Sequence, residues 1–270
     1  RILVELPGAK DVDRIKDLLQ STAQLEFWDG LRGSEFASFF QNADAYLRQI
    51  NTQTEDVSDT EEEVAEEEQD LENILEENTA EIDDVLEENT FTSLMRTPIF
   101  SSSSNVASFE PQDTAKINGF LKNPQVKALL PADKRYTKFL WGIPDSQTGL
   151  VDLHVVKGNR DNIPELSGGV VTDAAQVYSQ SGKVAVSMQM NGKGAKVWED
   201  MTGRAFQQQS TIAIVLDDIV YSAPFSSTGA IPGGRTEITG DFSVAEGQDL
   251  ANVLRAGKLP ASADIIQSEV

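Results

Sequence analysis

The chain has 270 residues, and its hydrophobic and charged fractions, 39% and 24%, are those of a globular protein. The longest uninterrupted apolar run is Ile212 to Leu216, much shorter than the roughly 20 residues of a membrane-spanning helix. Cysteine is absent, which excludes disulfides, thiolate metal sites and cysteine nucleophiles. The chain begins with Arg1, inside a predicted strand, so we expect a segment of a longer protein.

The net charge of -22 is concentrated in one region of the sequence. No basic residue occurs between Arg48 and Arg96, and Glu55 to Glu88 contains 18 acidic residues. The rest of the chain is nearly neutral and has no basic stripe that could follow phosphates. We therefore expect no nucleic-acid partner, and an anionic membrane surface would repel the chain.

The two ends of the sequence have the same predicted order of strand, helix and strand. At the N-terminus, strands at Arg1–Leu6 and Ala23–Trp28 flank an amphipathic helix. At the C-terminus, strands at Thr236–Thr239 and Ala263–Gln267 flank a helix that begins with the capping box Ser243–Glu246. This pattern predicts an α+β fold in which both termini build a split ferredoxin-like βαββαβ unit.

A second group of strands and a helix is predicted in the C-terminal half. Leu150–Val156 and Val184–Met190 have strand character, and a helix with a buried face at Trp198 and Met201 follows. Asp217-Asp218 then separates two apolar runs by the spacing of a two-residue hairpin turn.

Residues 30 to 148 differ in character. A helix with a broad apolar stripe, from Phe36 through Phe40 to Ile50, leads into the acidic segment 55–90. That segment repeats Leu-Glu-Glu-Asn-Thr at an interval of eleven residues, which is close to helical spacing. It is interpreted as a solvated helical face or a spacer, because it lacks the spacing of a calcium-binding loop.

Several residues have both a functional and a structural interpretation. Asp217-Asp218 could ligate a hard cation or form a turn, and His154 could act as a general base or occupy a strand. Gly192-Lys193-Gly194 has a superficial likeness to a phosphate loop but lacks its remaining residues. The methionines form either an adaptable peptide-binding surface or part of the core; they are Met188, Met190 and Met201.

Short sequence blocks resemble the first periplasmic region of the SecD family, a subunit of the bacterial Sec protein-export machinery. They occur in the order of the family and cover about half of the chain, within residues 1–29 and 149–270. The blocks are Leu6-Pro7-Gly8, Thr22 to Phe27, Leu166-Ser167-Gly168, Gly194-Ala195-Lys196, Ala213 to Asp217, Ser222-Ala223-Pro224, Gly233-Gly234, Ile238-Thr239-Gly240 and Leu254 to Pro260.

The resemblance implies a ferredoxin-like base, at residues 1–29 and 232–270, that carries a head at 149–231. Residues 30–148 are then an insertion that varies between lineages. The family implies a periplasmic segment of a bacterial inner membrane protein, with no cofactor, that engages unfolded preprotein. Its implied partners are SecF and the SecYEG channel, and export is driven by the proton gradient.

A head that moves relative to a base needs a hinge. The candidate hinge residues lie between the last strand of the head and the first strand of the C-terminal base segment, where the alternative is an ordinary loop; they are Gly229, Pro232, Gly233 and Gly234. The sequence assigns no substrate-binding residues.

Two classes of function remain open. The first is a non-catalytic module of the export machinery, and the second is a metal-dependent or hydrolytic enzyme on an α+β scaffold. The enzyme would need a nucleophile with its base, or a set of metal ligands, and the sequence shows neither pattern. We therefore predict no catalytic or metal site. An adaptor built around the acidic segment is a more distant alternative.

Overall fold

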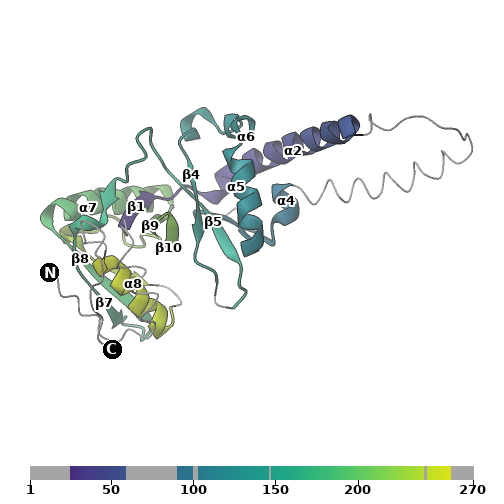
Figure 1. Ribbon diagram of the computed structural model, residues 1–270. Coiled ribbons are helices and arrows are strands. Elements are labelled where there is room, and N and C mark those ends of the chain that lie inside the picture. Colours follow the sequence, from purple (N-terminus) through teal and green to yellow (C-terminus); the bar gives the residue numbers. More distant parts are fainter. Residues whose placement is uncertain (1–24, 59–89, 100–102, 146, 240–241, 257–270) are drawn as a thin grey trace, which may run out of the picture.

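The computed structural model describes residues 25–58, 90–99, 103–145, 147–239 and 242–256 (Figure 1). These ranges contain an eight-stranded sheet, a three-stranded sheet and the helices that pack on them. Among the described residues, none of the helices combines the length and the apolar character that crossing a membrane requires.

The larger sheet has the strand order β2-β3-β5-β4-β10-β9-β1-β6. Its strands are β1 (Leu25–Asp29), β2 (Thr97–Pro98), β3 (Asn105–Phe109), β4 (Lys138–Gly142), β5 (Val151–Val156), β6 (Leu166–Ser167), β9 (Ile212–Leu216) and β10 (Ile219–Ser222). Neighbouring strands are antiparallel except β10 and β4, which are parallel.

The chain after β1 closes five of these strands into a ring. The carbonyl of Asp29 accepts a hydrogen bond of 2.8 Å from the N–H of Lys157, and the N–H of Leu31 donates one of 3.0 Å to the carbonyl of Val155. The end of β1 is thereby joined to the end of β5, and the ring runs through β9, β10 and β4. Gly30 is required at the crossing, because a Cβ there would lie 2.3 Å from Thr211 Oγ1.

Successive side chains of a strand point to opposite faces, and apolar residues line both the interior and the outer face of the ring. Its interior is filled by Trp28, Leu140, Val156, Ala213, Val215 and Val220. On the outer face, Leu25 and Phe27 of β1 and Ile212 and Ile214 of β9 face a second and larger core.

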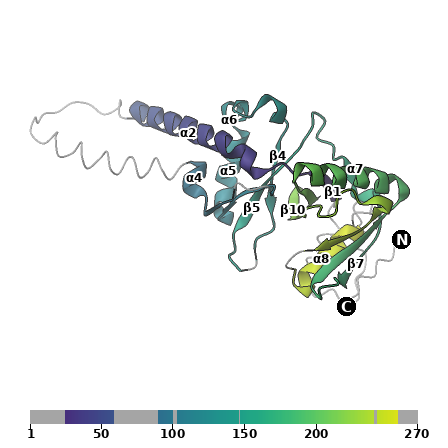
Figure 2. The same ribbon diagram turned by 180° about the vertical axis from the view of Figure 1, so that it is seen from behind.

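This larger core lies between the ring, the three-stranded sheet and two helices. The sheet has the order β11-β8-β7. The elements are β7 (Val171–Tyr178), β8 (Val184–Met190), β11 (Arg235–Thr239), α7 (Gly192–Gln208) and α8 (Val244–Ala256). Helix α8 contacts β7 and β8, and Figure 2 shows it beside β7.

A third core belongs to a lobe at the opposite end of the molecule, which we call the helical lobe. It consists of α2 (Ala37–Ser58), α4 (Phe91–Leu94), α5 (Thr114–Lys122) and α6 (Pro124–Ala128) on strands β3 and β5. Its core is rich in aromatic rings, and Phe40 contacts the rings of Phe39, Phe91 and Phe139 at centroid distances of 5.1, 5.1 and 6.3 Å. The far end of α2 projects away from both sheets (Figure 1). Short 3-10 turns occupy Gly33–Phe36, Pro111–Asp113, Ala132–Lys134, Gly168–Val170 and Pro232–Gly234.

A buried carboxylate fixes the point where the chain returns from the acidic segment. Asp44 of α2 is 5% exposed and accepts hydrogen bonds from the N–H groups of Phe91, at 2.7 Å, and Thr92, at 3.1 Å. It also accepts one from the hydroxyl of Thr92. The side chain thus satisfies the free donors at the start of α4 and binds α4 to α2.

The local predictions are confirmed within the described residues. The strand at Val184–Met190, the helix that follows it and the aromatic stripe of α2 are present. Asp217 and Asp218 form the hairpin turn between β9 and β10, with φ of +50° and +63°. The capping box of α8 is also formed, because Ser243 and Glu246 each accept a hydrogen bond from the other's N–H.

The predicted sharing of strands between base and head needs correction. The strands at Ala23–Trp28 and Thr236–Thr239 were both assigned to the base. Instead β1 pairs with β9 and β6, while β11 pairs with β8 of the predicted head. The physical reason is that each strand is apolar toward the core that its partners line, so pairing followed these shared faces rather than order in the sequence.

The predicted boundary between residues 148 and 149 also falls within one structural unit, because β4 and β5 on its two sides pair as antiparallel neighbours. The strands predicted at Arg1–Leu6 and Ala263–Gln267, and most of the acidic segment 55–90, lie outside the described residues. Their arrangement stays a prediction.

Candidate functional site

Helix α7 is the element on which the candidate site is built. The side chain of Asn191 caps it by accepting a hydrogen bond of 2.9 Å from the N–H of Gly194. A Cβ at Gly194 would lie 2.6 Å from the side chain of Val170, so this residue allows close packing. Gly192-Lys193-Gly194 is therefore the packed first turn of a capped helix, and the likeness to a phosphate loop is not supported.

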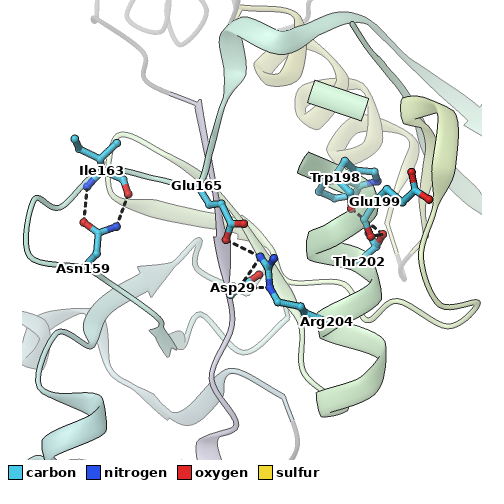
Figure 3. A network of polar contacts seen from close by, with 8 residues as sticks. All are labelled: Asp29, Asn159, Ile163, Glu165, Trp198, Glu199, Thr202 and Arg204. Atoms are coloured by element: carbon cyan, nitrogen blue, oxygen red, sulfur yellow. Dashed lines mark hydrogen bonds and ion pairs between the residues drawn. The ribbon is translucent and has the colours of Figure 1, made fainter. Parts of the chain in front are cut away.

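Arg204 joins α7 to two other parts of the chain (Figure 3). Its Nε and Nη2 atoms donate to Oδ2 of Asp29, at 3.2 and 3.0 Å, and Nη2 also donates to Oε2 of Glu165 at 2.6 Å. Asp29 ends β1, and Glu165 immediately precedes β6. Two carboxylates from distant segments thus share one guanidinium group.

The electrostatics of this cluster are unbalanced at Asp29. Burial raises the pKa of Asp29 and the negative charge of Glu165 raises it further, while Arg204 and Lys157 act in the opposite direction without cancelling the effect. One carboxylate oxygen, Oδ1, is buried and accepts no hydrogen bond from the described residues. The ion pair therefore carries a desolvation cost that its geometry does not fully offset.

Residues 229–234, which we call the strap, run along the surface of α7. The N–H of Ile231 donates a hydrogen bond of 2.9 Å to Oγ1 of Thr202, which in turn donates to the carbonyl of Trp198 at 2.7 Å. A Cβ at Gly203 would lie 3.3 Å from Cβ of Ala230. The strap is thus attached to the middle of the helix by one polar anchor and one close contact.

The ends of the strap contact opposite ends of α7. A Cβ at Gly229 would lie 3.8 Å from the ring of Phe206, and one at Gly234 would lie 2.7 Å from Cβ of Ala195. Gly229, Gly233 and Gly234 all have positive φ, at +87°, +78° and +68°, which other residues adopt only with strain. The candidate hinge residues, with Pro232 between them, therefore lie at the two ends of a docked segment, and the hinge role itself stays a prediction.

The remaining candidates have structural environments. Asp217 and Asp218 occupy the hairpin turn, where Asp218 pairs with Lys138 at 3.2 Å, and the described residues contain no group of three or more metal-ligating side chains. His154 is buried in β5 with Nδ1 at 3.1 Å from Oγ of Ser104. Burial lowers the pKa of His154 to about 4, against the opposing charge of Asp152, so the ring is neutral near pH 7 and has no access to a substrate.

The three methionines are core residues. Met188, Met190 and Met201 are at most 4% exposed and lie in the core between α7 and the three-stranded sheet. The interpretation as a peptide-binding surface is therefore wrong for these residues, because none of them reaches the surface.

The ion pairs of Arg204 were not predicted from the sequence. Asp29 and Arg204 are 175 positions apart, and no local pattern relates an acid at a strand end to a base on a distant helix. Thr202 gave a weak signal, because it is a hydroxyl residue next to Met201 on the apolar face of a predicted helix. Such a residue is often bonded to the preceding turn, as it is here.

Comparison with known proteins places this geometry in a family. A model described as "SecDF, P1 head subdomain" matches residues 156–261, and one described as "Protein translocase subunit SecDF, P1 domain, N-terminal" matches residues 1–31. The two matches together cover just over half of the chain. The chain belongs to the SecD family.

Relatives differ in how much of the chain they share. The SecD protein translocase subunit of Rhodothermus marinus is 33% identical over 267 residues, which is 99% of this chain and 41% of that protein. The SecD subunit of Syntrophobacter fumaroxidans is 41% identical over 103 residues, 38% of this chain and 19% of that protein. The chain therefore spans about two fifths or less of the length of these relatives, and the Rhodothermus protein aligns across the region of the helical lobe.

A solved structure described as "Structure and function of a membrane component SecDF that enhances protein export" is 23% identical, with a TM-score of 0.38; the match covers 99% of this chain and 78% of that chain. The members of the family are protein translocase subunits and not enzymes. The alternative of a hydrolytic or metal-dependent enzyme is therefore set aside.

Proposed function

We propose that this chain is the periplasmic part of a SecD subunit in the bacterial inner membrane, and that it contacts unfolded preprotein during export. It would act with SecF and the SecYEG channel, in a process driven by the proton gradient. The observation that carries the proposal is the match of residues 156–261 to the SecDF head subdomain, since this range holds α7, Glu165, Arg204 and the strap.

The strap is the proposed hinge of this module. A hinge absorbs changes of φ and ψ at a few positions while the elements on both sides stay intact. The strap has this arrangement, because glycines with positive φ stand at its ends and its middle is held to α7 by the bond between Ile231 and Thr202. Releasing that contact would free the connection between β10 and β11 without breaking a strand.

Recognition of an export client should not depend on its sequence. A module that accepts many unrelated polypeptides must rely on main-chain hydrogen bonds and on adaptable apolar contacts. It must also release each client, so we expect a dissociation constant on the order of micromolar or weaker.

The test is the fluorescence anisotropy of a labelled, unfolded and uncharged polypeptide titrated with this chain at low and high salt. The proposal predicts binding that persists at ~1 M salt, where attraction between exposed charges is largely screened. Binding that disappears in salt, or that requires basic peptides, would assign recognition to the acidic segment and contradict the proposal.

A further inference from the structure

One continuous stretch of the chain is depleted of charge. Between Ala205 and Gly234 the charged residues are Asp217 and Asp218, although charged residues make up 24% of the whole sequence. Both aspartates lie at the turn of the β9–β10 hairpin. The other end of this hairpin, where Thr211 faces Phe225, and the loop that leads to the strap carry no charge.

Two exposed aromatic rings flank that uncharged loop. Phe206 in the last turn of α7 and Phe225 after β10 are 50% and 51% exposed. The loop brings them to the same region, because the hydroxyl of Ser226 donates a hydrogen bond of 2.7 Å to the carbonyl of Gly229, and Gly229 lies against the ring of Phe206. Exposed rings beside an uncharged stretch of chain have the composition of an interface core.

The same region has an open strand edge. β10 pairs with β4 at Ile219 and Val220, and the last main-chain bond on that side joins the N–H of Ile143 to the carbonyl of Val220. On its other side β10 pairs with β9 as far as Ser222. Beyond the end of β10, the N–H of Ile212 donates a hydrogen bond of 3.0 Å to the carbonyl of Pro224, and Phe225 forms an isolated bridge with Thr211. Across the part of the chain that the structure describes, no strand pairs with the β4 side of residues 222–225. Such an edge is a template for another extended chain.

We infer that Phe206, Phe225 and the open edge at residues 222–225 form a docking surface for an extended, uncharged segment of an unfolded polypeptide with apolar side chains. The inference rests on the proposed function and names the surface that would carry it. Apart from Pro224, which has no N–H to donate, the edge supplies main-chain hydrogen bonds, and the two rings supply apolar contacts that do not select one sequence. The stretch that carries both rings has no charged side chain apart from the two aspartates of the turn, so it complements an uncharged polypeptide rather than a basic one. The acidic residues of a second copy would repel this chain.

The position of the client is tested by photo-crosslinking. Benzoylphenylalanine is introduced by the substitution Phe225→benzoylphenylalanine and, separately, at Phe206. Tyr178, at the end of β7 and 64% exposed, is the matched control on the other sheet. Crosslinks to the labelled, unfolded polypeptide should form several-fold more efficiently at the two phenylalanines than at the control. Equal or stronger crosslinking at Tyr178 would overturn the inference.

The contribution of the rings to affinity is tested by anisotropy with the same polypeptide. The double variant Phe206→Ser/Phe225→Ser should raise the dissociation constant about tenfold, as removal of interface aromatics does, while Tyr178→Ser leaves it unchanged. Both side chains are half exposed, so unfolding by urea should confirm that the variants keep their stability. Unchanged binding by the double variant would overturn the assignment of this docking surface but would not contradict the proposed function. Absence of binding by the unaltered chain would overturn both.

Discussion

The helical lobe and the SecD part of the molecule, β1 and β6 to β11 with α7 and α8, place their aromatic residues differently. In the lobe, Phe36, Phe40 and Phe91 are at most 1% exposed and form a ring-to-ring core. In the SecD part the core around α7 is largely aliphatic and contains methionine, while Phe206 and Phe225 are half exposed. Phe27 and Trp198 of the SecD part are also buried and meet in a T-shaped arrangement, so the contrast concerns the two half-exposed phenylalanines, whose surface is available for contacts.

Buried carboxylates show a second difference between the two regions. Asp44 in the lobe uses both oxygens, with Phe91 and Thr92 as donors. Asp29 at the α7 junction leaves one buried oxygen without a partner and has a raised pKa. Both oxygens of the carboxylate in the lobe are therefore hydrogen-bonded. At the junction one carboxylate oxygen is not, so keeping Asp29 ionised in the folded state costs free energy.

The largest loss of stability is expected from Phe40→Ala. Phe40 contacts three rings of the lobe core, and removal of a buried phenylalanine costs about 3–5 kcal/mol. Urea unfolding at equilibrium measures the change, and Phe225→Ala is the control, expected to change the free energy of unfolding by less than about 0.5 kcal/mol. Similar effects for the two variants would remove the contrast between the regions.

Asp44→Ala should cost less than Phe40→Ala, about 2–3 kcal/mol, because it leaves the N–H groups of Phe91 and Thr92 without an acceptor. Thermal unfolding of the chain reports the loss. In Asp44→Asn the amide oxygen still accepts one bond, so an intermediate effect is expected. If the alanine variant were as stable as the unaltered chain, α4 would have to be held by its packing alone.

Asp29→Asn should have a small effect with a characteristic dependence on pH. A raised pKa in the folded state means that the folded chain binds a proton more tightly than the unfolded chain does. As the pH rises from the ordinary carboxyl pKa through the raised pKa of Asp29, the contribution of Asp29 to the free energy of unfolding therefore decreases. Asparagine does not titrate, so the variant lacks this decrease.

The pH dependence is tested by urea unfolding of the unaltered chain and of Asp29→Asn at about pH 4 and about pH 7. The variant should gain stability relative to the unaltered chain at the higher pH. The groups facing Asp29 are Arg204, Glu165 and Lys157, so the same comparison in Glu165→Gln separates the two acids. A relative loss of stability at the higher pH would show that the bond to Arg204 outweighs burial.

The smallest effect is expected from deletion of Glu55 to Glu88. Adjacent like charges repel, and the described residues on the two sides of this segment are already held in α2 and α4, which Asp44 joins. The melting temperature should remain almost unchanged. A decrease of about 10 °C, equivalent to a loss of a few kcal/mol in a chain of this size, would show that the segment packs on the rest of the protein.

Features that depend on residues close together in the sequence could be predicted, and features that depend on distant residues could not. The turn at Asp217-Asp218, the capping box of Ser243 and the stripe of α2 are set by residues a few positions apart, and all were predicted. The partners of β1 and β11 were not, because several strands have apolar faces that fit the same core. The ion pair between Asp29 and Arg204 forms only in the assembled sheet, because the two residues are 175 positions apart.

The central claim, that the strap is a hinge which must leave α7 during export, is tested most directly by locking it. In Gly203→Cys/Ala230→Cys the two Cβ atoms are expected about 3.3 Å apart, close to the spacing of a disulfide, and the chain has no other cysteine. The measurement is preprotein export by membranes containing the full-length protein, oxidised and then reduced. We predict that export is lost in the oxidised double variant and restored by reductant, with each single variant unaffected. Full export by the oxidised, crosslinked protein would contradict the claim.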